Sequence, residues 1–165
     1  ALLSNGEEKI KGNQLVQETH ALLNKLGIAT TGNVEGKDLV RGLADVIVTD
    51  GFVGNVAIKT AEGVASMLMT LIKQELKSKP VSMLGGLLAK PAFKRVGKVL
   101  DFREYGGAPL LGVNGVVIIG HGRSDAMAVE NMIRVAGEAV QKNLVTHVRE
   151  DVAATLTDMD EGDAA

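Results

Sequence analysis

Two strand-like runs, each followed by a glycine-containing loop and a helix, constrain the fold of this chain most. The first run is residues 44–49 (ADVIVT), which leads through residues 50–55 (DGFVGN) into a long helical pattern. The second is residues 116–119 (VVII), which leads through residues 120–124 (GHGRS) into a last helical pattern. The β-branched residues 44–49 predict a strand buried on both faces, as in a parallel sheet covered by helices, and residues 116–119 predict a second strand. The chain is therefore expected to be an α/β protein.

Periodicity in the first half supplies the neighbouring elements. Apolar residues recur at helical spacing over residues 15–26, and Gly27 ends that pattern. Residues 28–31 (IATT) are expected to form a strand, and residues 32–38 (GNVEGKD) a turn-rich loop after it. Residues 1–4 (ALLS) have the pattern of the end of a buried strand, which indicates a piece of a longer protein.

Two prolines and one Asn-Gly pair divide the second half. Pro80 is expected to end the long helix, and Pro91 to break the helical stretch that follows. Asn114-Gly115 between apolar runs is a strong signal for a β-hairpin. Together the elements predict a three-layer α/β/α, Rossmann-like sandwich with a mixed sheet, in which parallel strands joined through helices accompany one antiparallel pair.

The last helix and the end of the chain have different characters. The helix is expected to bury a stripe formed by Val129, Ile133, Ala136 and Val140. The end of the chain carries six acidic residues and no basic ones from Glu150 onward. Residues 151–165 are therefore expected to be a frayed, solvated acidic tail.

The composition excludes several classes of function. The 165 residues carry a net charge of −2 and only 2% aromatic residues, so a basic or base-stacking surface for nucleic acid is not expected. The absence of cysteine removes disulfides, thiolate zinc sites and a cysteine nucleophile. The three histidines have no spacing typical of a metal site. No apolar run reaches the roughly 18 residues of a membrane span, so we expect a cytoplasmic domain without a metal.

The loops after the two strand-like runs are the candidate sites. In open α/β sheets, ligands bind beyond the carboxyl ends of the strands, where glycines let backbone N–H groups approach an anion. Asp50 and Asn55 in the first loop, and His121 in the second, add polar groups that favour a phosphate or a carboxylate as ligand. No nucleotide-binding or serine-hydrolase motif is present.

A purely structural interpretation of the same residues stays open. The glycines can serve tight turns alone, Asp50 can form an Asx-turn, and Asn55 can be the N-cap of the long helix. His121 can be a loop histidine bonded to the backbone. Lys11 and Asn13 precede the first helix and offer a cation and a helix N-terminus in the same way.

The segment from Lys73 to Arg103 is strongly basic. It holds eight lysines or arginines and two acidic residues, with apolar residues between them. Its part from about 78 to 100 is expected to be a basic amphipathic helical hairpin that contacts an anionic membrane surface or an acidic partner. The alternative is a helix packed on the core with a solvated basic face. The expected contact residues are Leu84, Leu87, Leu88, Lys90, Lys94, Arg95 and Lys98.

Several loop strings resemble those of the PlsX family, the bacterial phosphate acyltransferases of phospholipid synthesis. They are residues 32–36 (GNVEG), 49–55 (TDGFVGN) and 104–112 (EYGGAPLLG), supported by residues 5–13 (NGEEKIKGN) and 117–122 (VIIGHG). The strings stand in the family's order and spacing. The resemblance covers residues 1 to about 150 and places them in the C-terminal part of the family's domain. A looser likeness to phosphotransacetylases is present in the strand-to-helix loop and the hairpin block.

The resemblance implies a reaction in which a fatty acyl group moves from acyl carrier protein to inorganic phosphate, giving acyl phosphate. It also implies an isopropylmalate dehydrogenase-like or phosphotransacetylase-like sandwich, a homodimer, loose attachment to the membrane, and no cofactor. Phosphate is itself the nucleophile in such a reaction, so no covalent enzyme intermediate is required. On this interpretation the catalytic residues are Asn55, Lys59 and His121, and the phosphate or thioester is bound by Lys11, Asn13, Asp50, Gly51, Gly54 and Ser124.

Other functions are kept as alternatives. The first is a phosphotransacetylase that uses a soluble CoA thioester instead of a carrier-protein thioester. The second is a non-enzymatic module that docks on a membrane or a partner through the helical hairpin. A dehydrogenase of related fold is weaker, because no nicotinamide fingerprint is visible.

Overall fold

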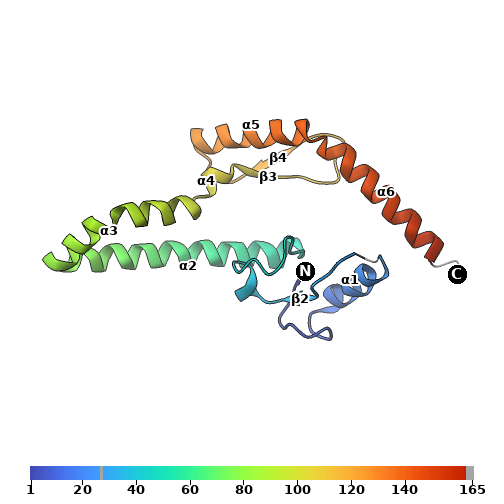
Figure 1. Cartoon of the computed structure of the whole chain (residues 1–165), viewed down its shortest axis with the longest axis horizontal. Helices are drawn as coiled ribbons and strands as arrows, with labels where there is room; N and C mark the ends of the chain where they lie inside the picture. The colour runs from blue at the N-terminus through green and yellow to red at the C-terminus, as the bar shows by residue number, and fades with distance from the viewer. Residues whose placement is uncertain (27, 163–165) are drawn as a thin grey trace. The chain divides into compact units, whose positions relative to one another are not determined.

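The computed structural model describes residues 1–26 and 28–162, except the side chains of residues 102 and 158–162. It shows a helix-rich mixed α/β protein with two small sheets (Figure 1). The chain forms two compact units, of which the first holds residues 1–67 together with the end of the chain from Thr155. The second unit holds residues 68–154. Gly27, expected to end the first helix, lies outside the described residues.

A parallel sheet organises the first unit. Strand β1 (Leu2–Leu3) pairs in parallel with β2 (Asn33–Val34), and helix α1 (Gln14–Lys25) connects them. On its other side β1 forms a parallel bridge between Leu2 and Val48. Leu2 is 3% exposed and Val34 5%, so this sheet supplies the core of the unit. The expected parallel arrangement, with strands joined through a helix, is confirmed.

The positions of two expected strands are wrong. Residues 28–31 are not a strand, because the chain bonds to β1 only from Gly32 onward, and Gly32 has a φ of +87° that is accessible to glycine. Residues 44–49 form only the bridge at Val48, and Val46 is 67% exposed. Among the described residues, no further strand extends the sheet beyond Val48, so this run lies at an edge and is not buried on both faces.

Helix α2 (Gly51–Ser78) begins earlier than expected. Residues 50–55 were expected to be a loop with Asn55 as a possible N-cap, but the helix already includes Gly51. The reason is Asp50, whose Oδ1 accepts hydrogen bonds from the N–H groups of Phe52 and Val53 at 2.9 Å each. Asp50 thereby satisfies the first N–H groups of the helix, and Asn55 lies inside it.

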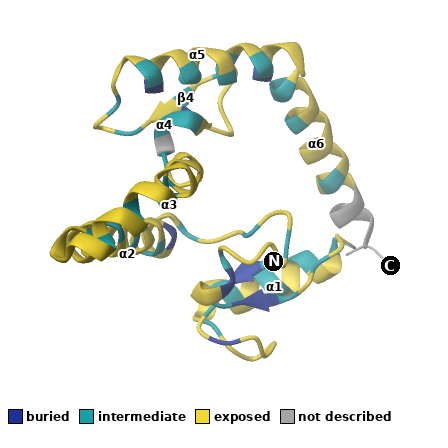
Figure 2. Cartoon of the chain, turned by 60° about the vertical axis from the view of Figure 1, so that its left-hand side comes forward, coloured by how far each residue is buried: buried dark blue, intermediate teal, exposed yellow. Residues whose placement is uncertain are grey.

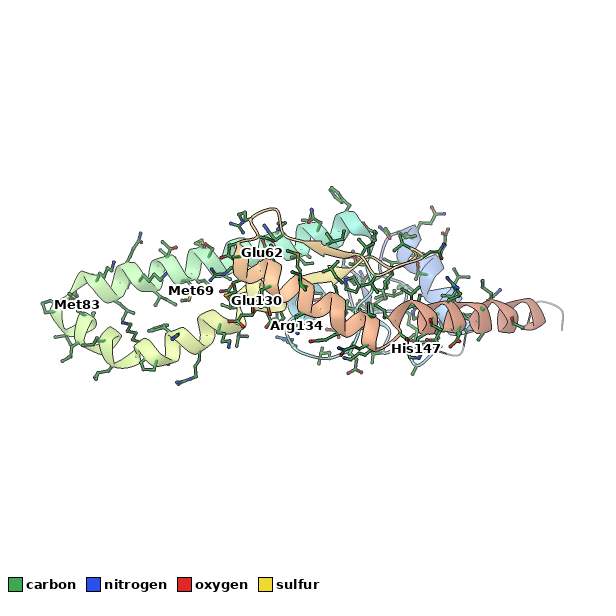
Figure 3. All side chains as sticks on the ribbon, turned by 90° about the horizontal axis from the view of Figure 1, so that it is seen from above. Glu62, Met69, Met83, Glu130, Arg134 and His147 are labelled. Atoms are coloured by element: carbon green, nitrogen blue, oxygen red, sulfur yellow. The ribbon has the colours of Figure 1, made fainter. Side chains whose placement is uncertain are left out.

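Helices α2 and α3 (Pro80–Val99) form a helical hairpin. The hairpin expected within residues 78–100 is wrong, because residues 80–99 form one continuous helix. Helix α2 ends at Ser78, just before Pro80, as predicted, and Pro80 occupies the first turn of α3. The second unit contains α2 from Leu68 onward. This part of α2 runs antiparallel to α3, with Met83 near the tip (Figure 3). A Cβ on Gly86 would lie 3.4 Å from the side chain of Leu76, so the two helices approach closely there.

Pro91 does not break α3, contrary to expectation. A proline removes one N–H donor and leaves the carbonyl four residues earlier without its helical partner. That carbonyl belongs to Leu87, which is 66% exposed, so water can replace the missing bond. Helix α3 has no buried residue in the described structure (Figure 2).

The rest of the second unit is a β-hairpin covered by a helix. After the short helix α4 (Phe102–Tyr105), β3 (Gly107–Pro109) pairs antiparallel with β4 (Ile118–Gly120), which confirms the predicted hairpin. Its strands lie further from Asn114-Gly115 than expected. The last ladder bond runs from the N–H of Leu110 to the carbonyl of Val117, so the turn is wide and not a two-residue one.

Helix α5 (Ala126–Gln141) packs on this hairpin with a different face from the one expected. Ala128 is fully buried and Ala139 is 8% exposed, whereas Ile133 of the predicted stripe is 69% exposed. The reason is steric: a Cβ on Gly106 would lie 2.6 Å from the backbone carbon of Asn131, so the hairpin lies directly against the backbone of α5. Helix α6 (Leu144–Gly162) includes most of the segment that was expected to be frayed.

Candidate functional site

Three loops of the first unit lie at one edge of its parallel sheet. They follow β1, β2 and the bridge residue Val48, and they comprise residues 4–13, 35–38 and 49–50. Because the carboxyl ends of parallel strands meet at the same edge, these loops and the N-termini of α1 and α2 gather there. This edge is where open α/β sheets bind ligands.

Loop 4–13 is held by the side-chain amides of Asn33, which is buried, and Asn5, which is exposed. The side-chain Nδ2 of Asn33 donates to the carbonyl oxygens of Glu8 at 2.9 Å and Lys11 at 3.3 Å. The N–H of Gly12 donates to Oδ1 of Asn5 at 2.9 Å, and Gly12 has a φ of +103°. Asn33 is 6% exposed, so it fixes the loop from inside the sheet.

Lys11 and Asn13 occupy the end of this loop. Asn13 is the N-cap of α1, and its Oδ1 accepts a hydrogen bond from the N–H of Val16 at 3.0 Å. Lys11 is exposed, and its backbone is fixed by the bond from Asn33. The structure therefore brings a cation to the N-terminus of α1, where the partial positive charge of the helix also lies.

Asp50, Gly51 and Gly54 shape the start of α2. The carboxylate of Asp50 accepts hydrogen bonds from the N–H groups of Phe52 and Val53, so the Asx-turn given as the structural alternative for Asp50 is present. Gly54 is buried, and a Cβ there would lie 2.6 Å from the side chain of Thr49. Asn55 lies exposed in the second turn of α2. Lys59, one turn further on, forms an ion pair with Glu62 at 3.0 Å.

A second cluster at the same edge surrounds residues 35–38. Glu35 and Asp38 form a reciprocal capping box around the 3₁₀ turn η1 (Gly36–Asp38), and Asp38 is 1% exposed. Lys37 pairs with Glu35 at 2.7 Å and with Glu7 at 3.1 Å. Its hydrogen bonds to Glu35 and then Glu7 raise the pKa of Lys37 above its ordinary value. Lys37 therefore stays charged and ties loop 4–13 to η1.

A cavity of about 320 Å³ opens in the first unit. It is lined by Glu7, Thr31, Asn33, Val34, Asp38 and Leu43. Its two carboxylates make it unsuited to an anion.

His121 and Ser124 lie in the second unit, in the loop between β4 and α5. The Nδ1 atom of His121 accepts a hydrogen bond from the backbone N–H of Arg123 at 3.1 Å. The hydroxyl of Ser124 donates to the carbonyl oxygen of His121 at 2.6 Å. A neutral imidazole that accepts at Nδ1 carries its proton on Nε2, so His121 is arranged as a donor through Nε2. Ser124 has its proton directed into the loop and closes the turn.

Arg103 joins this loop to the end of α3. Its guanidinium binds Asp101 at 2.6 Å and Asp125, the N-cap of α5, at 3.1 Å. The bond from Arg103 is the largest cause that lowers the pKa of Asp101. The pKa of Asp125 is also lowered, mainly by the hydrogen bond from the backbone N–H of Ala128 and next by the one from Arg103. A cavity of about 480 Å³ beside this cluster is lined by Gly97, Leu100, Asp101, Arg103, Arg123 and Asp125.

The predicted contact residues of α3 are exposed. Leu84, Leu87 and Leu88 are 61%, 66% and 76% exposed, and the basic residues Lys90, Lys94, Arg95 and Lys98 are exposed as well. Lys98 lies 3.6 Å from Glu104. None of the described helices combines the length and apolarity needed to cross a membrane. In the described part of the chain, no group of His, Cys, Asp or Glu side chains could hold a metal ion.

The structure thus gathers Lys11, Asn13, Asp50 and Gly51 at one sheet edge, and places His121 with Ser124 in one loop. Three structurally important residues were not singled out as site residues: Asn33, Asp38 and Arg103. Asn33 and Asp38 stand in the strings 32–36 and 32–38, which were noted only as loop or as a family likeness. Arg103 offered no signal, because its partner Asp125 is distant in sequence.

A parallel sheet joined through a helix, with polar loops at its carboxyl edge, places the chain among the α/β proteins. The chain matches the family described as "Fatty acid synthesis protein" over residues 1–147. It is 53% identical over 152 residues, 92% of the chain, to the phosphate acyltransferase of Heliobacterium modesticaldum, covering 45% of that protein. It is 61% identical over 142 residues, 86% of the chain, to the phosphate acyltransferase of Dictyoglomus turgidum, covering 42% of it.

The chain therefore belongs to the fatty acid synthesis protein family, the PlsX family that its loop strings resemble. It spans less than half the length of the curated relatives it matches.

Proposed function

We propose that the protein containing this chain transfers a fatty acyl group from acyl carrier protein to inorganic phosphate, and that the acyl phosphate formed serves phospholipid synthesis. The observation that carries the proposal is the gathering of helix N-termini, Lys11 and Asn13 at the carboxyl edge of the parallel sheet. The relatives named phosphate acyltransferase support it. The proposal includes a three-layer Rossmann-like sandwich completed by further strands, a homodimer, and peripheral contact with the membrane.

The reaction requires little covalent chemistry from the protein. A phosphate oxygen attacks the thioester carbonyl carbon, the new C–O bond forms, and the C–S bond breaks to release the carrier thiolate, which takes up a proton. Positioning phosphate against the thioester and stabilising the tetrahedral oxyanion are then the main contributions of the enzyme. Neither needs a cysteine or a cofactor.

The phosphate is held, on this proposal, by side chains more than by the first N–H groups of α2. Asp50 already occupies the N–H groups of Phe52 and Val53. The exposed amide of Asn55 and the ammonium of Lys59 follow on the next turns. Asp50, Gly51 and Gly54 then set the shape of the turn, and Lys11 and Asn13 add a second helix N-terminus with a cation.

His121 is proposed to supply a proton or a hydrogen bond through Nε2. Its Nδ1 is engaged by the N–H of Arg123, which fixes the tautomer that a donor requires. The departing thiolate or a phosphate oxygen is the acceptor that this donor fits. Ser124 contributes by closing the turn, and it can contact phosphate only if its hydroxyl leaves the carbonyl oxygen of His121.

Helix α3 is proposed as the surface that meets acyl carrier protein or lipid headgroups. Three exposed leucines near its start and four exposed basic residues toward its end give it the chemistry of an interfacial helix. A non-enzymatic docking module is the second candidate function, and these exposed leucines are the observation that favours it.

The test is acyl phosphate formation by the full-length protein. Long-chain acyl carrier protein is supplied with and without inorganic phosphate, and acyl phosphate is trapped with hydroxylamine. Phosphate-dependent hydroxamate is the expected result. Hydroxamate formed only from acyl-CoA would favour a phosphotransacetylase. Binding to vesicles without product from either donor would favour the docking module.

A further inference from the structure

Arg103 fixes the end of the loop that carries His121. Its Nε donates to Oδ1 of Asp101 at 2.8 Å, and its Nη2 donates to Oδ2 of Asp101 at 2.6 Å. Its Nη1 donates to Oδ2 of Asp125 at 3.1 Å. Asp101 follows α3 closely and Asp125 ends the loop, so a single guanidinium joins two segments distant in sequence.

The cavity beside Arg103 does not have the charge of an anion site. Two arginines line it, which alone would favour a phosphate. Asp101 and Asp125 line it as well, so the four charged side chains sum to zero. Arg103 directs three of its nitrogens to these two carboxylates. The hydrogen-bond donors of Arg103 are therefore engaged by groups of the protein and serve to hold them in place.

Asp125 performs two functions with its two oxygens. Oδ1 accepts the N–H of Ala128 at 3.0 Å and caps α5, while Oδ2 accepts from Arg103. Ala128 is fully buried, so the cap is anchored in the packed face of α5. The side-chain Nδ2 of Asn131 also donates to the carbonyl oxygen of Arg103 at 2.9 Å, which fixes the arginine backbone to the same helix.

The orientation of the His121 ring depends on this anchored loop. Nδ1 of His121 accepts from the backbone N–H of Arg123, two residues before Asp125. If Asp125 moves, the backbone at Arg123 moves with it, and the bond that selects the Nε2–H tautomer weakens. The planar guanidinium of Arg103, bound to two carboxylates, holds Asp125 in place better than the flexible ammonium of a lysine would.

We propose that Arg103 is a positioning residue for His121: through Asp125 it holds the loop in the conformation in which His121 presents Nε2–H. The consequence for catalysis rests on the proposed function, whereas the effect on the imidazole does not. Arg103 acts through the loop and does not itself contact the reacting atoms.

The test uses the full-length protein labelled with ¹⁵N-histidine and three variants. Arg103→Met removes the fork, and Asp125→Asn keeps an N-cap for α5 but removes the carboxylate that Arg103 binds. Arg149→Met is the matched control, because Arg149 lies exposed on α6 and donates to Asn114 in the turn of the β-hairpin, with no hydrogen bond to Arg103, Asp125 or Asn131 among those described. The imidazole ¹⁵N signals of His121, assigned by their loss in His121→Gln, report its tautomer. Acyl phosphate formation reports kcat and KM.

Arg103→Met and Asp125→Asn are expected to shift the His121 signals from a single Nε2–H tautomer to a mixture. Arg149→Met is expected to leave them unchanged. A displaced catalytic group can cost up to about 100-fold in rate, so kcat should fall by about 10- to 100-fold with little change in the KM for phosphate. Arg103→Lys should restore only part of this loss.

A folded Arg103→Met protein with an unchanged His121 tautomer would overturn the proposal, whether or not kcat falls. If Arg103→Met does not fold, the His121 signals of Asp125→Asn decide instead, and an unchanged tautomer in that variant would overturn the proposal. If the wild-type protein makes no acyl phosphate, the proposed function fails, and the imidazole signals still decide the positioning role.

Discussion

The carboxylate of Asp50 accepts a hydrogen bond from the backbone N–H of Val53 at 2.9 Å, so α2 begins with an anion of its own chain at its N-terminus. The same oxygen accepts the N–H of Phe52. A bound phosphate can take these N–H groups only if Asp50 moves. The capping role of Asp50 can therefore be separated from the phosphate-binding role of its neighbours.

Asp50→Ala should destabilise the protein by about 0.5–2 kcal/mol, because the helix loses its N-cap. Asp50→Asn is the matched control, since asparagine caps about as well as aspartate. The free energy of unfolding in urea measures both. Equal destabilisation by the two substitutions would mean that the charge, and not the cap, matters.

Glu62→Gln should lower the KM for phosphate, and Lys59→Met should raise it. Lys59 pairs with Glu62 at 3.0 Å, so loss of the carboxylate makes its ammonium more available to an anion. Since exposed pairs of this kind contribute about 1 kcal/mol or less, the change for Glu62→Gln should not exceed about fivefold. An unchanged KM in Lys59→Met would remove Lys59 from the phosphate site.

Gly106→Ala should destabilise the protein by about 2 kcal/mol or more. Gly106 has a φ of +81°, and a Cβ there would lie 2.6 Å from the backbone of Asn131. Both the left-handed conformation and the contact with α5 therefore oppose a side chain. Gly115→Ala, where a Cβ meets open space, is the control and should change the unfolding free energy by less than about 1 kcal/mol. Similar losses of unfolding free energy in Gly106→Ala and Gly115→Ala would contradict the packing described for α5.

The α/β class, the helix of residues 14–25 and the β-hairpin were predictable because local signals determine them. The helical hairpin was placed within residues 78–100, whereas α2 and α3 form it. Asn13 caps α1 and Pro80 starts α3 as those residue types predict. Strand positions were less predictable. Residues 28–31 and 33–34 both have acceptable strand composition, and only pairing with β1 decides between them. The start of α2 was missed because Asp50 and Asn55 are equally good caps by residue type.

The buried face of α5 and the role of Arg103 could not be predicted for a different reason. Both depend on contacts between residues far apart in the sequence. Ile133 and Met132 are both apolar, and the close approach of Gly106 decides which of the two faces is covered. Arg103 finds Asp125 only after the hairpin has formed.

Stability of the second unit should fall as the pH drops below about 4. Folding lowers the pKa of Asp101, mainly through Arg103, and that of Asp125, mainly through the N–H of Ala128. Groups with a lowered folded pKa contribute stability above their unfolded pKa and lose it as the pH falls through the folded value. Asp125→Asn should reduce the acid sensitivity, measured as the urea midpoint at pH 7 and pH 3. Glu130→Gln, at an exposed position of α5, is the control and should leave the acid sensitivity unchanged.

Leu87→Gln and Leu88→Gln should weaken binding to vesicles that contain phosphatidylglycerol. Each leucine is more than 60% exposed in the protein and would bury apolar surface in the lipid interface, with a free energy of up to about 1.5–3 kcal/mol. A loss of at least about tenfold in partition coefficient is expected for each. Leu22→Gln, at an exposed position of α1, is the control. Unchanged sedimentation with vesicles in both α3 variants would contradict a lipid contact at this helix and leave carrier protein as its partner.

The most direct test of the central claim is the phosphate dependence of acyl phosphate formation by wild-type and Asn55→Ala full-length protein. Asn24→Ala, at an exposed position of α1, is the matched control. We expect Asn55→Ala to lower kcat/KM for phosphate by about 100-fold or more, the loss typical of an oxyanion donor, and Asn24→Ala to have no effect. An Asn55→Ala protein with wild-type kcat/KM would contradict the claim that phosphate is bound at the start of α2.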